Sequence, residues 1–204
     1  MALTTRIGGF ILAGGESSRM GRPKALLQLA GEPMVLRTVR LVGDVAGSVL
    51  VIGPPRRYES LGLHTIVDDF PGAGPLGGIA TALRAASKDW NLIVACDLPY
   101  LTRGWLECLA ARAAASSGDA VIPMTERGAE PLCAMYNKRC EAPIRGALAN
   151  GTRKVTDALA SVRVESIGPA EWKAFDSEGL LFKNINSPAD FEEVKARLEG
   201  RASR

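Results

Sequence analysis

Apolar runs with the character of β-strands alternate along the chain with segments whose apolar residues recur at helical spacing. The strand-like runs are Gly8 to Ala13, Val49 to Ile52, His64 to Val67, Leu92 to Cys96 and Ala120 to Pro123. Helical spacing is found over Pro33 to Leu41, Leu76 to Ala86 and Trp105 to Ala115. Because such alternation is typical of parallel strands joined by crossover helices, it predicts an α/β fold with a mostly parallel central sheet and helices on both faces.

After Pro131 the alternation is less regular. The pattern there predicts a strand over Leu132 to Tyr136 and helices over Glu141 to Ala149, Lys154 to Ala160 and Pro188 to Leu198. The last helix has a clear start signal, since Ser187 is a preferred N-cap residue, Pro188 suits the first helical position and Asp190 places a carboxylate in the first turn.

The composition is that of a soluble globular protein of one compact domain. The chain has 204 residues, 47% of them hydrophobic and 23% charged, which argues against a disordered or fibrous chain. The longest uncharged apolar runs fall far short of the roughly 20 residues of a membrane helix. The first residues lack the features of a secretory signal, so we expect a cytoplasmic location and no membrane partner.

Charge and residue counts narrow the function classes further. Residues 1 to 60 hold eight Lys and Arg against four Asp and Glu, a local excess that suits a small polyanion rather than nucleic acid, and the scattered Trp and Tyr residues offer no stacking platform. The four cysteines form no close pairs, so we interpret them as free thiols. Because His64 is the single histidine, any metal must be held by carboxylates.

Residues 12 to 27, LAGGESSRMGRPKALL, have the content of a phosphate-binding loop between the first strand and the first helix. Gly14 and Gly15, with Gly21 further on, let backbone N–H groups approach a ligand, and Arg19 and Lys24 add cationic donors for phosphate oxygens. The spacing fits neither a Walker A loop nor a dinucleotide fingerprint, which implies a different triphosphate loop. The alternative is a glycine-rich turn with two solvated cations.

The chain resembles the nucleotidyltransferases, specifically the molybdenum cofactor guanylyltransferases. In the loop the resemblance rests on Leu12-Ala13-Gly14-Gly15, Ser17, Arg19-Met20-Gly21 and Lys24-Ala25-Leu26-Leu27. It continues through Gly74-Pro75-Leu76-Gly77-Gly78-Ile79, Cys96-Asp97-Leu98-Pro99-Tyr100, Glu130-Pro131-Leu132-Cys133-Ala134 and Asn184-Ile185-Asn186-Ser187-Pro188. The loop departs from the family at Pro23, where an acidic residue usually precedes the lysine.

The resemblance implies a Rossmann-like, GT-A-like three-layer sandwich, with a single domain over residues 1–204. Its nucleotide-binding half would be about residues 1–100 and its acceptor-binding half about 101–204. The implied reaction is Mg²⁺-dependent transfer of GMP from GTP to molybdopterin or the molybdenum cofactor with release of pyrophosphate, and molybdoenzyme-loading proteins would be further partners. The alternatives are CMP transfer, another small phosphorylated acceptor, or a nucleotide-binding module without catalysis.

Asp97 is the expected metal ligand, because it follows a buried strand at the carboxyl edge of the sheet and Mg²⁺ needs only one or two protein carboxylates beside substrate phosphates. The alternative is an Asp that only caps the turn before Pro99 or begins the helix after Thr102. With it, Lys24 and Arg19 form the expected catalytic set. The expected ligand contacts are Leu12, Ala13, Gly14, Gly15, Lys24, Gly53, Asp68, Asp97, Asn184 and Asn186.

Asp68 and Asp69 precede a Pro- and Gly-rich loop, where a carboxylate could accept the two N–H donors of guanine. We favour Asp68, and an Asp-rich turn without a ligand is the alternative. By resemblance a further nucleotide contact falls near Gly53, which could supply only backbone.

Asn184 and Asn186, two apart on an extended segment, should face the same way and share a ligand, and the resemblance implies that this ligand is the pterin or a phosphate. The alternative is that they only tie the segment to the following helix. Arg153 and Lys154 form another candidate anion contact, with a solvated helix start as the alternative.

Overall fold

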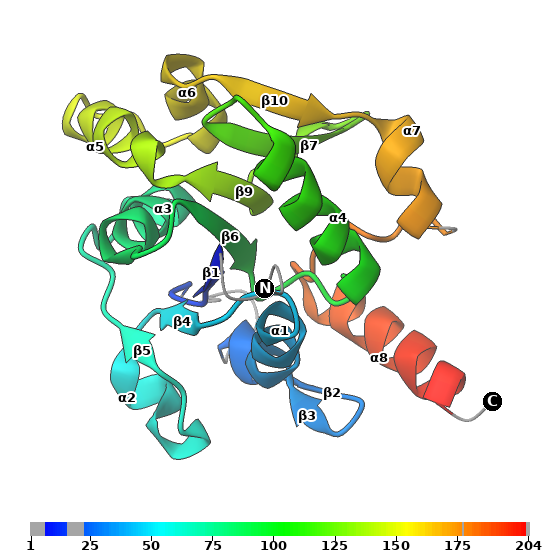
Figure 1. Ribbon diagram of the computed structural model, residues 1–204. Coiled ribbons are helices and arrows are strands. Elements are labelled where there is room, and N and C mark those ends of the chain that lie inside the picture. The colour runs from blue at the N-terminus through cyan, green and yellow to red at the C-terminus, as the bar shows by residue number, and fades with distance from the viewer. Residues whose placement is uncertain (1–6, 16–22, 177, 203–204) are drawn as a thin grey trace.

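The computed structural model describes residues 7–15, 23–176 and 178–202, which form a twisted sheet between two layers of helices (Figure 1). Within these residues the main sheet has the strand order β10-β7-β9-β6-β1-β4-β5, and β8 extends it by pairing with β7. The strands are β1 (Ile7–Leu12), β4 (Val49–Ile52), β5 (Thr65–Ile66), β6 (Trp90–Ala95), β7 (Ala120–Thr125), β8 (Gly128–Ala129), β9 (Cys133–Asn137) and β10 (Val164–Ile167). A small separate hairpin consists of β2 (Gln28–Leu29) and β3 (Glu32–Pro33).

The predicted mostly parallel sheet is confirmed, with two strands, β8 and β9, that run opposite to the others. β1 pairs in parallel with β4 and with β6, and in this register Leu12 lies opposite both Ile52 and Ala95. The carboxyl ends of these three strands are therefore level, so that the residues following each strand meet at one sheet edge. β9 runs antiparallel between β6 and β7, a reversal that the apolar pattern alone did not reveal.

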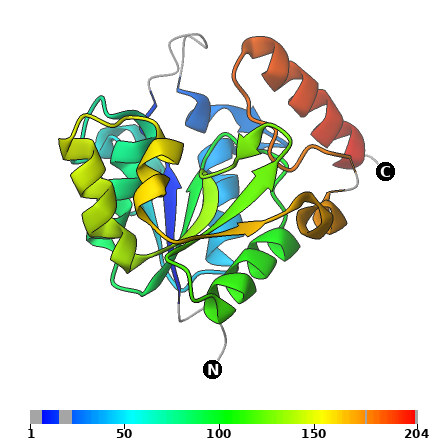
Figure 2. The ribbon, with the colours of Figure 1, turned by 90° about the horizontal axis from the view of Figure 1, so that it is seen from above.

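Helices cover both faces of the sheet, as expected. Figure 2 shows the sheet between α5 and α6 on one side and α4 on the other. The helices are α1 (Met34–Gly43), α2 (Pro55–Tyr58), α3 (Gly74–Ala85), α4 (Arg103–Ala115), α5 (Glu141–Ala149), α6 (Val155–Ala158), α7 (Pro169–Trp172) and α8 (Pro188–Ala202). Short 3-10 turns lie at Lys24–Leu26, Glu59–Leu61, Lys138–Cys140, Leu159–Ser161 and Lys173–Phe175. None of the described helices has the length and apolar character needed to cross a bilayer.

The sheet divides the buried side chains into two main clusters, one on each face. The first joins Val35 of α1 and Leu106 of α4 to inward-facing residues of β1 and β6. The second joins Ile79 of α3 and Ile144 of α5 to the opposite face. Cys96, Cys133 and Cys140 are buried and Cys108 is half-buried, all as free thiols, which confirms the interpretation of the cysteines.

The last helix begins as predicted. The Ser187 hydroxyl accepts a hydrogen bond from the Asp190 N–H at 3.2 Å, and the Asp190 carboxylate accepts from the N–H groups of Ser187 and Asn186 at 2.8 and 2.9 Å. This reciprocal cap fixes the chain entry to α8. The helix continues beyond the expected Leu198 to Ala202.

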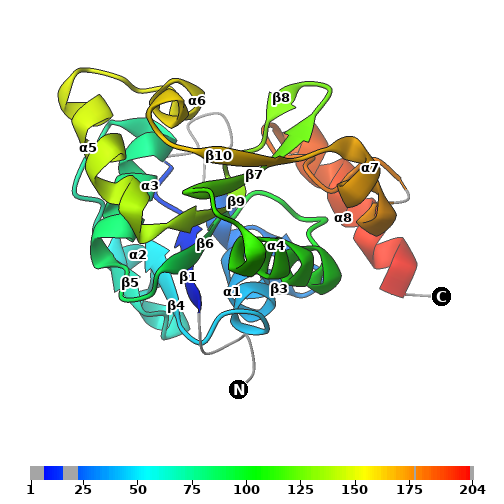
Figure 3. The same cartoon turned by 45° about the horizontal axis from the view of Figure 1, so that its top comes forward.

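Several short elements escaped the pattern analysis. β10 has four residues and joins α6 to α7 across the edge of the sheet (Figure 3). The strand expected over His64 to Val67 is shorter, with Val67 62% exposed beyond its end. The helix expected over Lys154 to Ala160 is α6 followed by a 3-10 turn. Elements of two to four residues bury too few side chains to produce a period of their own.

The start of α3 packs closely against the loop before it, so that a side chain at Gly77 would have no room. A Cβ on Gly77 would lie 2.8 Å from the Phe70 carbonyl oxygen, which belongs to the loop before the helix, whereas a Cβ on Gly146 of α5 would meet nothing within 4 Å. We expect Gly77→Ala to lower the free energy of unfolding by about 1–3 kcal/mol through overpacking. Gly146→Ala should raise it by about 0.5–1 kcal/mol through helix propensity.

Urea unfolding of the two variants beside the wild type measures both effects. Equal changes for the two substitutions would contradict the close packing of α3 on the Phe70 loop.

Candidate active site

The level strand ends of β1, β4 and β6 and the start of α3 enclose a cleft of about 760 Å³. This volume lies within the range typical of small-molecule sites. The cleft is lined by Leu12, Ala13, Gly14, Gly15, Lys24, Ala25, Ile52, Gly53, Pro54, Val67, Asp68, Pro71, Gly72, Gly74, Pro75, Gly78, Ala95, Cys96, Asp97 and Leu132. It brings together every expected contact of the nucleotide-binding half except Arg19, which lies outside the described residues.

The glycine-rich loop reaches the cleft directly from β1. The Ala13 N–H donates to the Ile52 carbonyl at 2.9 Å and continues the ladder between β1 and β4 by one residue. A Cβ on Gly15 would meet no atom of the described residues within 4 Å, so these residues leave the backbone there open to a ligand. The described residues continue at Pro23, which has φ −59°. The Pro23 carbonyl accepts a hydrogen bond from the Leu26 N–H at 3.0 Å, and Lys24 therefore lies at the start of a 3-10 turn.

Two residues that the sequence did not indicate hold this loop from α2. The buried Tyr58 hydroxyl donates to the Ala13 carbonyl at 2.5 Å, and the Arg57 guanidinium donates to the Gly15 carbonyl at 3.2 Å. A single tyrosine in a four-residue helix produces no periodic signal, so only the tertiary contact reveals it.

Gly53 lines the cleft beside this anchor. A Cβ there would lie 3.1 Å from the Ala13 oxygen and 3.2 Å from the Tyr58 ring. Glycine at this position therefore permits the close approach of the two loops, and Gly53 can offer a ligand only backbone groups, as expected.

Asp97 and Lys24 face one another at the cleft. The Asp97 side chain is only 22% exposed, and its Oδ2 lies 3.9 Å from Lys24 Nζ. Its Oδ1 is buried and has no hydrogen-bond partner among the described residues. Burial raises the pKa of Asp97 above its usual value, while the charge of Lys24 acts in the opposite direction.

The C-terminal segment contacts the same pair. Lys24 Nζ donates to the Asn186 side-chain oxygen at 3.2 Å, and the Ile185 N–H donates to the Asp97 carbonyl at 3.1 Å. Ile185 is buried, whereas its two neighbours Asn184 and Asn186 are not, as expected for an extended segment. Asn186 therefore joins the site through Lys24.

The donor set at Asp97 fits a magnesium ion that shares its ligands with a substrate. A buried carboxylate oxygen without a hydrogen bond is costly unless a cation or proton completes it. Over the described ranges no three His, Cys, Asp or Glu side chains gather as a metal cage. Mg²⁺ bound by one carboxylate and by substrate phosphates suits this arrangement.

The structure distinguishes the two adjacent aspartates. Asp68 lines the cleft, and its Oδ1 accepts from the Thr81 hydroxyl and the Phe70 N–H, both at 2.9 Å. The bond to Phe70 is the turn contact of the alternative interpretation, but it engages only one carboxylate oxygen. Asp69 is exposed and paired with Arg84 of α3, whose Nη2 lies 3.0 Å from Oδ1.

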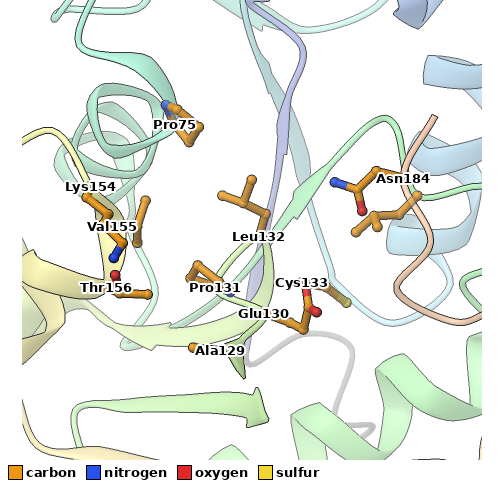
Figure 4. A pocket seen from close by; sticks show the side chains of 11 residues that line it. Pro75, Ala129, Glu130, Pro131, Leu132, Cys133, Lys154, Val155, Thr156 and Asn184 are labelled. Carbon is orange, nitrogen blue, oxygen red and sulfur yellow. The ribbon is translucent and has the colours of Figure 1, made fainter. Parts of the chain in front are cut away.

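Asn184 lies in a second pocket of about 220 Å³ that adjoins the cleft at Pro75 and Leu132 (Figure 4). Its walls are Pro75, Leu98, Ala129, Glu130, Pro131, Leu132, Cys133, Lys154, Val155, Thr156 and Asn184. Asn184 therefore faces the second pocket, whereas Asn186 contacts Lys24 at the cleft. Lys154 lines the second pocket, whereas Arg153 donates to the Leu148 and Thr152 carbonyls and lies outside it.

A mostly parallel sheet with a glycine-rich loop, a lysine and a half-buried aspartate around a nucleotide-sized cleft defines the class of nucleotidyltransferases. A family model described as MobA-like NTP transferase domain matches residues 9–164. The chain belongs to this family.

Relatives match over nearly the full chain. The "Probable molybdenum cofactor guanylyltransferase" of Pelotomaculum thermopropionicum is 35% identical over 96% of this chain and 94% of its own length. The protein of the same name from Synechococcus elongatus is 37% identical over 91% and 96%. The crystal structure of molybdopterin-guanine dinucleotide biosynthesis protein A from Archaeoglobus fulgidus superposes with a TM-score of 0.83 at 25% identity, covering 95% of this chain and 99% of that one.

The environment of Asp97 predicts a cost to stability that depends on pH. Because burial raises the pKa of Asp97 in the folded protein, the folded state holds this proton more tightly than the unfolded chain, and stability is lost as the pH rises through the folded pKa. Asp97→Asn should therefore raise the free energy of unfolding at pH 7, and the gain should shrink toward the unfolded pKa of about 3.9.

Urea unfolding between pH 8 and pH 4, with chelator and without nucleotide, measures this difference. Asp44→Asn, at the exposed end of α1, is the control, because it removes a carboxylate that lies outside the cleft. A loss of stability in Asp97→Asn at every pH would contradict the uncompensated burial of the carboxylate.

Proposed function

We propose that the protein transfers GMP from GTP to molybdopterin or the molybdenum cofactor and releases pyrophosphate. The observation that carries the proposal is the pairing of Lys24 with the half-buried Asp97 at the edge of a nucleotide-sized cleft. The choice of GMP and of this acceptor is supported by the names of the relatives that match nearly the whole chain.

GTP would lie along the cleft with its phosphates at the loop and its base near Asp68. The backbone at Gly14 and Gly15 and the ammonium of Lys24 offer donors for phosphate oxygens. We propose that Arg19, outside the described residues, adds a second cation there. At the other end Asp68 retains one carboxylate oxygen beyond the turn, which can accept from the donors on the guanine edge.

The reaction needs no nucleophile from the protein. A terminal phosphate oxygen of the acceptor attacks the α-phosphorus of GTP, a new P–O bond forms, and the bond to the pyrophosphate oxygen breaks. Lys24 holds phosphate oxygens in place and stabilises the charge that develops on them. Asp97 would hold Mg²⁺, which when bound supplies further charge neutralisation for the transferred and leaving groups.

The two adjoining pockets support the assignment of the nucleotide and the acceptor to different parts of the chain. The cleft is lined mainly by residues 12–97, and the second pocket mainly by residues 129–156 with Asn184. We therefore place the nucleotide in the half of about residues 1–100 and the acceptor in that of about 101–204, within one domain. A cytoplasmic location, and delivery of the product to molybdoenzyme-loading proteins, complete the proposal.

Product analysis tests the reaction directly. The protein is incubated with Mg²⁺, molybdopterin and each nucleoside triphosphate in turn, and pyrophosphate and the dinucleotide are followed. Guanine-specific product supports the proposal. A cytidine product would overturn the base assignment, and nucleotide binding without any product would favour a non-catalytic module.

Substitutions of Asp97 and of Lys24 should affect kcat and the KM for GTP differently. Asp97→Asn should lower kcat by about 100-fold or more, because charge stabilisation at the reacting phosphates is lost. Lys24→Met should raise the KM for GTP as well as lower kcat, since Lys24 contacts the phosphates before and during transfer. Steady-state pyrophosphate release measures both, with Asp44→Asn as control, and wild-type kinetics in Asp97→Asn would remove the metal assignment.

The proposed selection of guanine by Asp68 can be tested with two variants at neighbouring positions. Asp68→Asn keeps an acceptor for Thr81 and Phe70 but replaces the other carboxylate oxygen with an NH₂ donor, so it should lower the preference for GTP over CTP by about 10–100-fold. Asp69→Asn removes only the pair with Arg84 and should leave the preference unchanged. Competition between the two nucleotides measures the ratio. Equal behaviour of the two variants would place base recognition elsewhere.

A further inference from the structure

The second pocket contains charged groups of both signs on opposite walls. Figure 4 shows Lys154 and Thr156 on one side and Glu130 and Asn184 on the other, with Pro131 and Leu132 between them. The pocket opens beside the nucleotide cleft, from which it is separated by Pro75 and Leu132. A molecule lying here would therefore be neighbour to a nucleotide in the cleft.

Glu130 is the unusual group of this pocket. It is half-buried between β8 and β9, where its N–H donates to the Pro123 carbonyl at 2.8 Å and thereby fixes its backbone. Within the described ranges no Lys or Arg forms an ion pair with its carboxylate, and the Thr125 hydroxyl lies 3.1 Å from Oε1 alone. Burial raises the pKa of Glu130 despite that hydroxyl and the charge of Arg127.

The chemistry of a matching ligand follows from this environment. A partly desolvated carboxylate is stabilised by N–H donors, and two adjacent donors can engage both of its oxygens. The 2-amino-4-oxopyrimidine edge of a pterin offers a ring N–H next to an exocyclic NH₂. The amide of Asn184 on the same side can serve the remaining polar atoms of such a ring.

We propose that Glu130 recognises the pterin edge of the acceptor and is a specificity-determining residue for it. This inference rests on the proposed function and adds the residue that selects the acceptor ring. Guanine carries the same donor edge, but Glu130 belongs to the second pocket and Asp68 to the cleft. The two carboxylates therefore read the same pattern of donors on two different substrates.

Steady-state kinetics of GMP transfer separates the two carboxylates. Glu130→Gln keeps the size of the side chain but replaces one acceptor oxygen with a donor, so the KM for molybdopterin should rise about tenfold or more while the KM for GTP stays within about twofold. Glu126→Gln is the matched control, because this glutamate lies on the same hairpin with 89% of its side chain exposed. An unchanged KM for molybdopterin, or a rise in the KM for GTP alone, would overturn the proposal.

A binding measurement distinguishes failure of this inference from failure of the proposed function. The intrinsic fluorescence of 6-hydroxymethylpterin reports binding to the full chain without nucleotide, and 6-hydroxymethyllumazine, which has an oxo group in place of the 2-amino group, is the matched ligand. The wild type and Glu126→Gln should prefer the pterin, and Glu130→Gln should lose that preference.

One outcome is that the wild type prefers the pterin, that Glu130→Gln loses this preference, and that the wild type transfers no GMP. This outcome would retain the inference about Glu130 and overturn the proposed function. If the wild type transfers GMP normally but binds the pterin and the lumazine equally well, the proposed function is retained and the inference about Glu130 is overturned. Thermal unfolding of the variants controls for folding. If Glu130→Gln fails to fold, Glu130→Asp, which withdraws the carboxylate by one methylene, should show a partial loss of preference, and full retention would contradict the proposal.

Discussion

The register of three parallel strands is the constraint on which the site depends. Leu12 lies opposite Ile52 on one side and Ala95 on the other, so β1, β4 and β6 end at the same level. The chain leaves each strand into a different part of the cleft: the glycine-rich loop, Gly53 and Asp97. A shift of one residue in either pairing would reverse the faces of a whole strand and separate these groups. Burial on both faces of the sheet therefore holds the site in place.

Carboxylates line both pockets of a protein whose substrates are themselves anionic. Their surroundings differ, and this difference assigns each a separate task in the proposed reaction. Asp97 has a buried oxygen without a hydrogen-bond partner among the described residues, and Lys24 lies nearby, which suits a metal ion beside phosphates. Among the described residues neither Asp68 nor Glu130 forms an ion pair, and each accepts from a threonine hydroxyl, which suits recognition of N–H donors on a neutral ring. Phosphates would lie nearest to Asp97, where positive charge is available.

Much of the fold was accessible from the apolar pattern, because a helix that buries one face repeats its apolar residues at a regular period and a buried strand forms a continuous apolar run. The predicted helix over Glu141 to Ala149 and strand over Val49 to Ile52 match the structure residue for residue. The direction of β9 was not accessible, since a run of five buried residues reads the same whichever way the strand points. Tyr58 and Arg57 escaped because their contacts with the loop span more than 40 residues of sequence.

The sequence by itself determined the α/β class, the resemblance to the guanylyltransferases, and several of the residues that line the cleft, among them Lys24 and Asp97. These depend on local order: a glycine-rich loop after a strand, an aspartate after a strand, a capped helix at the end. The sequence favoured Asp68 over Asp69, but only the tertiary structure showed that Asp68 lines the cleft while Asp69 pairs with Arg84. The tertiary structure alone decided that Asn186 contacts Lys24 while Asn184 faces a second pocket. Neighbouring residues of one type look alike in sequence. The packing of distant elements determines which side chain reaches the cleft and which pairs elsewhere.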